Sequence, residues 1–446
     1  MNAAKLALCA GLALATLSTA APAGHARNID RDTLPANDGW ASLATAALPQ
    51  GTTGGSAAAP ERVHEVRDRN ELVAALAFPD PTPKIIRIVG DIDANVDAEG
   101  RPLSCADYAR PDPQTATPYT LEAFLAAYDP ATWGRVNPSG PLERARLASV
   151  AAQQARVRIR VPANTTVVGV GRDARVRGAW FDIRPGSTSG NQPMNVIVRN
   201  LRFEDTYDCF PQWSPTDGAS GNWNSQYDAI SVRNATHVWI DHNDFKDAAT
   251  VDATLPTYFG RLYQIHDGLV DVTNESDLVT VSWNRFGEHD KAMLVGSSDS
   301  AIADRGKLRL SLHHNLFHNL GQRVPRVRYG QVHVYNNLYS VDRDGAARYA
   351  YSWGVGTESQ IYAQNNHFLT DRALTPELFI DRLNGSRLHA AGTLHNGRAV
   401  DPVAAFNAAN ADTLIDTVDW TPTLYRRIDP AWLVPIQVLI GAGPSR

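Results

Sequence analysis

The sequence predicts an all-β fold, a right-handed parallel β-helix (a solenoid) with loop insertions and a C-terminal packing segment. A short motif, apolar-x-apolar-x-x-(Asn or Leu)-x-aromatic, recurs along the second half of the chain. Its aromatic positions are 42, 41, 31, 22 and 29 residues apart, which fits a base period of about 22 residues with inserted loops. The copies are Val196–Phe203, Val238–Phe245, Val279–Phe286, Leu310–Phe317, Val332–Tyr339 and Ile361–Phe368.

Each copy of the motif reads as one short strand followed by a polar corner. A single strand of this kind cannot bury its apolar face alone, so the copies are expected to stack into a continuous core. Val281 and Leu312 should then point inward, and the corner asparagines should hydrogen-bond with one another. A β-sandwich would need hairpin turns, and Asn-Gly or Asp-Gly pairs are mostly missing between adjacent strands. A propeller would need a fixed period near 40–50 residues.

The N-terminus is typical of an export signal, predicted at residues 1–26. Lys5 precedes an apolar run from Leu6 to Leu17, and small residues follow. The run is too short to span about 30 Å of hydrocarbon. We therefore expect a secreted protein, with a leader or linker at residues 27–60 and a single parallel β-helix catalytic domain at residues 61–446.

Outside the repeat, a few segments have a recognisable pattern. Residues 84–90 look like a buried strand. Residues 121–128 and 142–155 have helical patterns inside an insertion. From residue 369 onward the repeat is lost, and we expect residues 369–446 to pack along the solenoid or to cap it.

Three cysteines occur, at positions 9, 105 and 209. Cleavage of the signal would remove Cys9. In an oxidising compartment Cys105 and Cys209 could form a disulfide, or they could remain two buried thiols. The sequence leaves both open.

Charge is unevenly distributed although the net charge is only −5, which argues against a nucleic-acid-binding footprint. Residues 241–277 contain eight acidic residues, and residues 303–328 contain six basic ones. In a solenoid these stretches lie on neighbouring coils. An acidic patch beside a basic one suits a hard cation together with a polyanion, or it merely solvates the outside of the fold.

Five motifs in order, between about residues 196 and 368, carry a resemblance to a known family. They are Tyr227-Asp228-Ala229-Ile230, Val238-Trp239-Ile240-Asp241-His242, His266-Asp267-Gly268-Leu269-Val270-Asp271, His289-Asp290-Lys291, and Gln322 to Arg328 followed by Tyr329 to His333. The chain resembles the pectate lyase family of right-handed β-helices. This resemblance implies a calcium-dependent enzyme that cleaves polygalacturonate by endo-type β-elimination.

The resemblance implies that Asp228, Asp267 and Asp271 bind Ca²⁺. The residue types agree with this role. Asp267 and Asp271 are four positions apart and share one face of a strand. Carboxylates gathered in one place repel one another unless a cation neutralises them, and oxygen ligands are those that Ca²⁺ takes.

The resemblance also implies that Arg323 is the base that removes the C5 proton of galacturonate, and that Lys291 and Arg328 bind the substrate carboxylate. Arginine normally stays protonated, so this role requires neighbouring positive charges that favour loss of its proton. In the alternative interpretation, Arg323 only binds substrate.

Two histidine motifs are interpreted as structural. Asp241 and His242 could form an acid–base pair, but they sit in a repeat and are expected to pack coils. His313, His314 and His318 could suggest a transition metal, but they lie on a repeat strand and its corner without a spaced ligand set.

Three other functions are compatible with a β-helix. A pectin lyase would act on methylated pectin and would lack the calcium aspartates. A polygalacturonase would need paired acids for hydrolysis. A non-catalytic polysaccharide-binding β-helix would need neither Arg323 nor a lysine beside the metal. The expected partner is polygalacturonate, bound by a monomer without nucleic acid or membrane.

Overall fold

The computed structural model describes residues 29–187, 190–342, 345, 347–371 and 373–444. The predicted signal at residues 1–26 lies outside the described residues. Within the described part of the chain, every helix is too short or too polar to traverse a bilayer.

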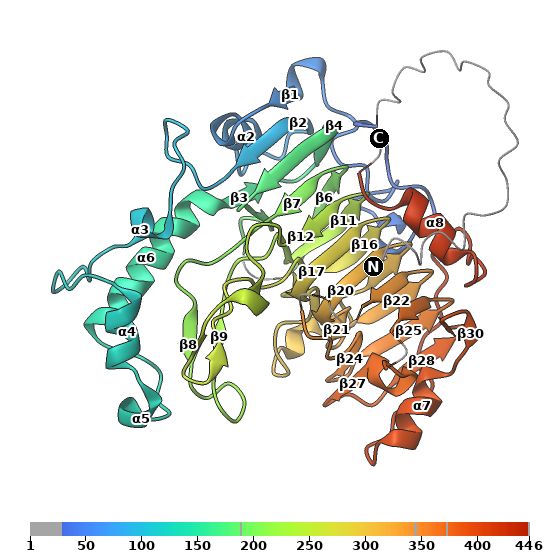
Figure 1. Ribbon diagram of the computed structural model, residues 1–446. Helices are drawn as coiled ribbons and strands as arrows, with labels where there is room; N and C mark the ends of the chain where they lie inside the picture. The colour runs from blue at the N-terminus through green and yellow to red at the C-terminus, as the bar shows by residue number, and fades with distance from the viewer. Residues whose placement is uncertain (1–28, 188–189, 343–344, 346, 372, 445–446) are drawn as a thin grey trace, which may run out of the picture.

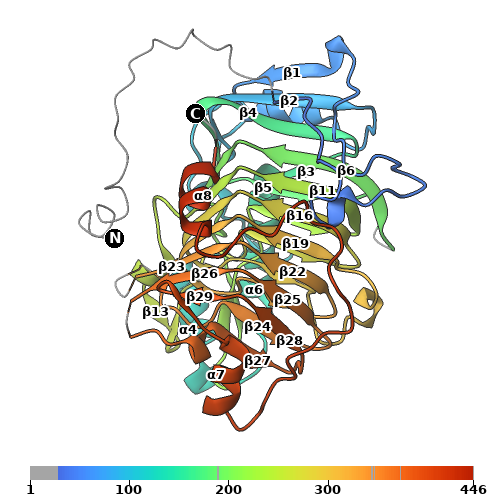
Figure 2. The ribbon, with the colours of Figure 1, turned by 90° about the vertical axis from the view of Figure 1, so that its right-hand side faces the viewer.

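Parallel strands stack in three rows, one strand of each row per coil (Figures 1 and 2). The first and second rows are joined through the long strand β4 into an 18-stranded sheet, and the third row is an eight-stranded sheet. In Figure 2 the coils run from β1 and β2 at one end to β27 and β28 at the other.

The first row consists of β1 (Val63–Val66), β2 (Lys84–Asp93), β4 (Thr165–Arg177), β6 (Gln192–Arg199), β11 (Ala235–Asp241), β16 (Asp277–Ser282), β19 (Leu310–His313), β22 (Gln331–Tyr335), β25 (Gln360–Gln364) and β28 (Leu388–Ala391). The second row consists of β7 (Arg202–Glu204), β12 (Asp244–Lys246), β17 (Arg285–Lys291), β20 (Leu316–Gln322), β23 (Leu338–Val341), β26 (His367–Thr370) and β29 (Leu394–His395). The third row consists of β3 (Arg158–Val161), β5 (Trp180–Ile183), β10 (Ile230–Arg233), β15 (Val270–Thr273), β18 (Leu294–Val295), β21 (Arg326–Val327), β24 (Trp353–Gly356) and β27 (Ile380–Leu383).

Helices and hairpins occupy the insertions and the ends. The helices are α2 (Arg69–Leu76), α3 (Cys105–Tyr108), α4 (Leu121–Ala127), α5 (Pro130–Trp133), α6 (Pro141–Val157), α7 (Pro402–Ala409) and α8 (Val434–Gly441). The short antiparallel pairings are β8 (Gln212–Ser214) with β9 (Asn222–Asn224), β13 (Thr257–Tyr258) with β14 (Arg261–Leu262), and β29 with β30 (Arg398–Ala399). Short 3₁₀ helices are η1 (Trp40–Ser42), η2 (Pro60–Arg62), η3 (Asp252–Thr254), η4 (Ile302–Asp304) and η5 (Pro376–Phe379). The predicted strand at residues 84–90 and both predicted helices are confirmed by β2, α4 and α6.

The corner between the first and second rows is built from the polar positions of the repeat. One residue per coil adopts a left-handed backbone there, for example Trp283 with φ 55° and His314 with φ 54°. The next residue is the repeat's asparagine, and these side chains bond to one another as expected. Asn315 Nδ2 donates to Asn337 Oδ1 at 3.0 Å, and Asn284 Nδ2 donates to Asn315 Oδ1 at 3.1 Å. The full ladder is Asn243, Asn284, Asn315, Asn337 and Asn366.

Replacing Asn315 by alanine should lower the free energy of unfolding by about 3 kcal/mol, because buried backbone groups would lose their partners. The Asn315 side chain donates to the Val281 carbonyl at 2.9 Å and accepts from the Asn284 amide at 2.9 Å. Urea unfolding measures the change. Asn70→Ala, which removes one exposed bond to Ala98, should cost less than about 1 kcal/mol. Equal effects of the two substitutions would contradict the ladder's role.

Aromatic side chains stack inside the solenoid at the last position of the motif. Phe203 and Phe245 lie 4.9 Å apart between ring centroids, and Phe245 and Phe286 also 4.9 Å. Val281 and Leu312 are fully buried in the same core. Their inward orientation was predicted and is confirmed.

The repeat does not end at residue 369, so that expectation was wrong. Residues 388–395 form one more coil, in which β28 pairs in parallel with β25 and β29 with β26. Thr393 and His395 occupy the positions held by Asn and an aromatic residue in earlier coils. His395 lies directly opposite Phe368 in the register. The coil was missed because both of its signature positions are substituted.

The two ends of the core are closed by helices. Leu72 and Leu76 of α2 are buried in the main core near β2, and Val403 and Phe406 of α7 are buried in it at the far end. The rest of the C-terminal segment runs back along the solenoid, where α8 packs against β23. The C-terminal segment therefore caps one end of the solenoid with α7 and packs along its side with α8.

The segment expected to be a leader or linker packs on the first row. The Ala41 amide donates to Thr280 Oγ1 at 3.0 Å, and the Gly54 amide to Asn195 Oδ1 at 2.8 Å. Cys105 of α3 is disulfide-bonded to Cys209, which ties the helical insertion to the segment that follows β7.

Candidate active site

Two of the predicted calcium aspartates converge between β10 and β15. Asp228 precedes β10, and Asp271 lies within β15 opposite Ser231. Gly268 sits between the two carboxylates, where a Cβ atom would lie 2.4 Å from Asp271 Oδ1 and 2.9 Å from Asp228 Oδ1. Only glycine lets these two side chains approach so closely over the backbone.

The third aspartate, Asp267, is held by a lysine. Lys291 ends β17, and its Nζ atom lies 3.3 Å from Asp267 Oδ1. Gly268 forms a parallel bridge with Lys291, so the two residues lie on neighbouring coils. Within the described residues no three His, Cys, Asp or Glu side chains form a ready-made metal-binding group, which agrees with Asp267 being turned to Lys291.

The electrostatics of the aspartates suit a bound cation. Burial, reinforced by Asp271 and then Asp267, raises the pKa of Asp228 well above its usual range. Burial and Asp267 raise the pKa of Asp271 to about 7, against the opposing Leu294 amide, Arg323 and Lys291. Carboxylates that repel one another in this way are neutralised by protons or by a cation. Because every donor is an oxygen, the set fits Ca²⁺.

Arg323 lies one coil beyond Lys291. Gln322 is directly opposite Lys291 in the pairing of β17 with β20, and the Arg323 carbonyl accepts from the Met293 amide at 2.7 Å. The backbone of Arg323 is left-handed, with φ 59°, so the chain turns sharply there. Its Nε atom is buried without a hydrogen-bond partner in the structure. The Arg323 side chain as a whole is half-buried at this corner.

Arg328 follows β21 and is more constrained than the sequence indicated. Its Nε atom lies 2.5 Å from Asp299 Oδ1, and Nη1 donates to the Gly296 carbonyl at 3.0 Å. Burial and the neighbouring Arg328 lower the pKa of Arg326, with a further contribution from Arg323. The positive charges of Arg323, Arg326 and Arg328 therefore act on one another. Arg328 is in addition oriented by its ion pair with Asp299.

A buried histidine supports the aspartate loop, a role that sequence reasoning missed. His289 Nε2 lies 2.6 Å from the Asp267 carbonyl oxygen, and Nδ1 lies 2.8 Å from Asp247 Oδ2. Both acceptors require a proton on the ring, so the imidazole is cationic. Although burial opposes its charge, Asp247 raises the pKa of His289 to about 9. The only sequence signal was its place in the His289-Asp290-Lys291 motif.

The charge-segregated stretches serve two purposes. Several of the bases join coils: Lys307 is paired with Glu275, and Arg309 Nε lies 2.9 Å from Asp277 Oδ1. Arg305 is paired with Glu358 at 2.5 Å. The remaining bases, Arg323, Arg326 and Arg328, surround the site. The ion pairs of the first subset join coils, and a role of the second subset in binding a polyanion beside a cation stays a prediction.

A solenoid that carries carboxylates, a lysine and arginines at one corner of successive coils defines a β-helical polysaccharide lyase. A sequence model of the family described as pectate lyase matches residues 139–419. A pectate lyase of Bacillus subtilis (strain 168) is 45% identical over 438 residues, covering 98% of each chain. The chain belongs to the pectate lyase family.

Solved structures agree in fold and in family. A Bacillus subtilis pectate lyase variant aligns with a TM-score of 0.85 and 45% identity, covering 94% of this chain and 99% of that chain. A structure described as pectate lyase bound to hexasaccharide aligns with the same TM-score, identity and coverage. The right-handed parallel β-helix predicted from the sequence is therefore confirmed, and the protein is a polysaccharide lyase.

Proposed function

We propose that the protein is a secreted, monomeric, calcium-dependent pectate lyase that cleaves α-1,4-polygalacturonate within the chain. The products are 4,5-unsaturated oligogalacturonides. The observation that carries the proposal is the convergence of Asp228 and Asp271 over Gly268, beside Lys291 and one coil from Arg323. Secretion is supported by the Cys105–Cys209 disulfide, since disulfides persist in oxidising compartments.

In the proposed mechanism Asp228, Asp267 and Asp271 hold Ca²⁺, which when bound supplies positive charge to the C6 carboxylate of galacturonate. Lys291 and Arg328 bind the same substrate carboxylate. These positive groups stabilise the negative charge that grows there as the C5 proton leaves. Because they are fixed by the coils before substrate arrives, little reorganisation is needed.

Arg323 is proposed to accept the C5 proton. The electron pair of the broken C5–H bond forms the C4–C5 double bond, and the C4–O bond breaks. The leaving oxygen takes the electron pair of the C4–O bond and gains a proton from solvent, and Arg323 later returns the C5 proton to solvent, so no water is consumed overall.

Incubation with polygalacturonate and Ca²⁺ should produce the ultraviolet absorbance of a 4,5-unsaturated uronide. Sizing of the early products should give a broad range of lengths, because endo-type cleavage occurs within chains. Highly methylated pectin should react more slowly, since an ester lacks the carboxylate that Lys291 and Arg328 bind. Reducing ends without ultraviolet absorbance would indicate hydrolysis and refute the elimination, and faster cleavage of methylated pectin would indicate a pectin lyase.

A further inference from the structure

A cluster of four arginines, which we call the arginine patch, lies on the outer face of the third row. Its members are Arg158, Arg160, Arg184 and Arg233. Because Ile159, Phe181 and Ile230 are buried in the core, the residues beside them in β3, β5 and β10 point outward. One outward column consists of Arg160, Asp182, Ser231 and Asp271, each opposite the next. Neighbouring strands are about 4.8 Å apart, so Arg160 lies about 14 Å from Asp271 along this column.

Asp182 lies at the centre of the arginine patch and is fully buried. Its Oδ2 atom lies 2.7 Å from Arg158 Nε and 3.5 Å from Arg184 Nε. Its Oδ1 atom lies 2.6 Å from Arg233 Nη2. In the part of the chain that the structure describes, no acidic side chain forms an ion pair with Arg160, which contacts an aromatic ring instead. Four guanidinium groups around one carboxylate therefore leave an excess of three positive charges.

The electrostatics of the arginine patch agree with this excess. Burial lowers the pKa of Arg160, and Arg158 and Arg233 lower it further, against the opposing charge of Asp182. Burial and the three neighbouring arginines also lower the pKa of Arg184, again against Asp182. Like charges that are held together in this way favour a bound anion.

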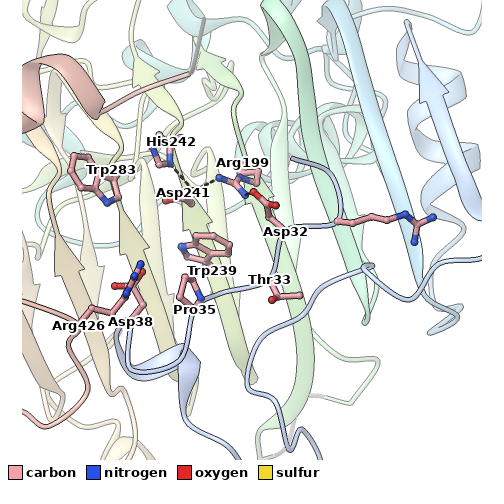
Figure 3. A pocket seen from close by; sticks show the side chains of 11 residues that line it. Asp32, Thr33, Pro35, Asp38, Arg199, Trp239, Asp241, His242, Trp283 and Arg426 are labelled. Atoms are coloured by element: carbon pink, nitrogen blue, oxygen red, sulfur yellow. Dashed lines mark hydrogen bonds and ion pairs between the residues drawn. The ribbon is translucent and has the colours of Figure 1, made fainter. Parts of the chain in front are cut away.

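The arginines near the first row are balanced, in contrast to the arginine patch. Arg199 pairs with Asp241 at 2.9 Å and with Asp32 at 3.1 Å, as Figure 3 shows. Arg426 lies beside Asp38 in the same view. The excess of positive charge in the arginine patch therefore lies on the row that carries the aspartates, and not on the face shown in Figure 3.

Trp180 holds the arginine patch in place and links it to the aspartates. Its ring centroid lies 5.0 Å from Arg158 Cζ and 4.9 Å from Arg233 Cζ. Its Nε1 atom donates to Ser231 Oγ at 2.7 Å, and Ser231 Oγ donates to Asp228. These contacts arrange the guanidinium groups before a ligand binds, which lowers the cost of binding.

We propose that the arginine patch binds carboxylates of a polygalacturonate chain, so that the substrate surface extends from the aspartates across the coils of β10, β5 and β3. The inference rests on the proposed function and adds the part of the chain that lies beyond the reacting sugar. Polygalacturonate carries one carboxylate on each sugar, and guanidinium groups bind carboxylates through paired hydrogen bonds. The arginine patch should therefore favour long substrates, because only a long chain spans the roughly 14 Å from Asp271 to Arg160.

The first test compares a long substrate with a short one in the presence of calcium. For the double variant Arg160→Gln/Arg184→Gln we expect KM on polygalacturonate to rise about tenfold or more, through loss of two charge-assisted contacts, with kcat kept. Kinetics on trigalacturonate should match the wild type, since this substrate has at most two sugars on either side of the cleaved bond. The matched control is Arg309→Gln on the first row, where Arg309 lies 2.9 Å from Asp277 and 5.2 Å from the Trp40 ring; it should match the wild type on both substrates.

The second test measures binding without turnover. Decagalacturonate is titrated into the full-length protein in excess chelator and its binding is followed by calorimetry. The wild type should bind it, less tightly as salt rises, and Arg160→Gln/Arg184→Gln should bind about tenfold more weakly. Arg160→Lys/Arg184→Lys keeps both charges and should bind more tightly than the glutamine variant.

Four outcomes would overturn the proposal. They are an unchanged KM of the glutamine variant on polygalacturonate, an equal rise of its KM on trigalacturonate, no binding of decagalacturonate by the wild type, and a lysine variant that binds as weakly as the glutamine variant. A failure of the proposed function is distinguishable, because a protein without lyase activity would still show the differences in binding. Conversely, an active lyase without those differences would refute only the role of the arginine patch.

Discussion

Arg323→Lys is expected to lower kcat by about 100- to 10,000-fold, the usual contribution of a general base. Lysine keeps the positive charge but not the planar guanidinium fork, so it cannot place a neutral nitrogen at the same point. The left-handed turn at Arg323 and the Met293 bond to its carbonyl belong to the backbone and should survive the change. Steady-state kinetics on polygalacturonate measures kcat and KM separately.

The control for this substitution is Arg305→Lys, because Arg305 is 57% exposed and pairs with Glu358, away from the aspartates. It should keep normal kinetics. Since the base must lose its proton, wild-type kcat should also rise toward alkaline pH until another group titrates. A rise in KM without loss of kcat would make Arg323 a binding group instead. A near-normal kcat would assign the proton transfer elsewhere, with Lys291 the next candidate.

The fold was predictable because each coil repeats the same pattern of buried, corner and aromatic residues. In each coil the first-row strand buries alternate residues, the chain turns at a polar corner, and the following second-row strand places an aromatic ring in the core. Asn284 and Phe286 could therefore be assigned from their spacing alone. The last coil escaped because Thr393 and His395 fill the same positions without matching the pattern. The repeat was recognised by its residue types, whereas the parallel pairing of the strands continues where those residue types change.

The site was predictable only in part. The spacing of Asp267 and Asp271 predicts one shared strand face, which is wrong, because Asp267 precedes β15 and is turned to Lys291. The close approach of Asp271 to Asp228 depends on Gly268, which spacing cannot reveal. The salt bridge between Arg328 and Asp299 and the support of Asp267 by His289 join different coils. Such contacts depend on which loops are inserted between coils, and no local pattern encodes them.

The N-terminal segment shows the same limit. Residues 29–60 lack periodicity, and low periodicity usually indicates a linker. In the structure these residues satisfy their polar groups on the outer face of the first row, where Asn195 and Thr280 receive their amides. Their order comes from the sheet beneath them and not from any pattern of their own.

Removal of calcium is expected to abolish cleavage, and Asp271→Asn should raise the calcium concentration required for half-maximal activity by about tenfold or more, since a charged ligand is lost. The exposed Asp217→Asn on the β8–β9 loop is the matched control and should leave the requirement unchanged. Activity titrations in buffered calcium measure both. Full activity in excess chelator would refute the calcium site.

Without calcium, Asp271→Asn is expected to stabilise the fold, whereas with calcium it weakens metal binding. The pKa of Asp271 is raised from 3.8 to about 7, so its ionisation costs folding free energy that appears as pH rises above 4 and is complete above 7. Metal-free Asp271→Asn should therefore melt at a higher temperature than the wild type at pH 8, with the difference fading toward pH 4.

Protons compete with calcium for the same carboxylates, so the wild type should also need more calcium as pH falls below 7. Calorimetry with and without calcium measures these shifts. A metal-free variant that melts lower than the wild type at pH 8 would show that the Asp271 carboxylate stabilises the fold, and that the aspartates do not repel one another as their burial implies.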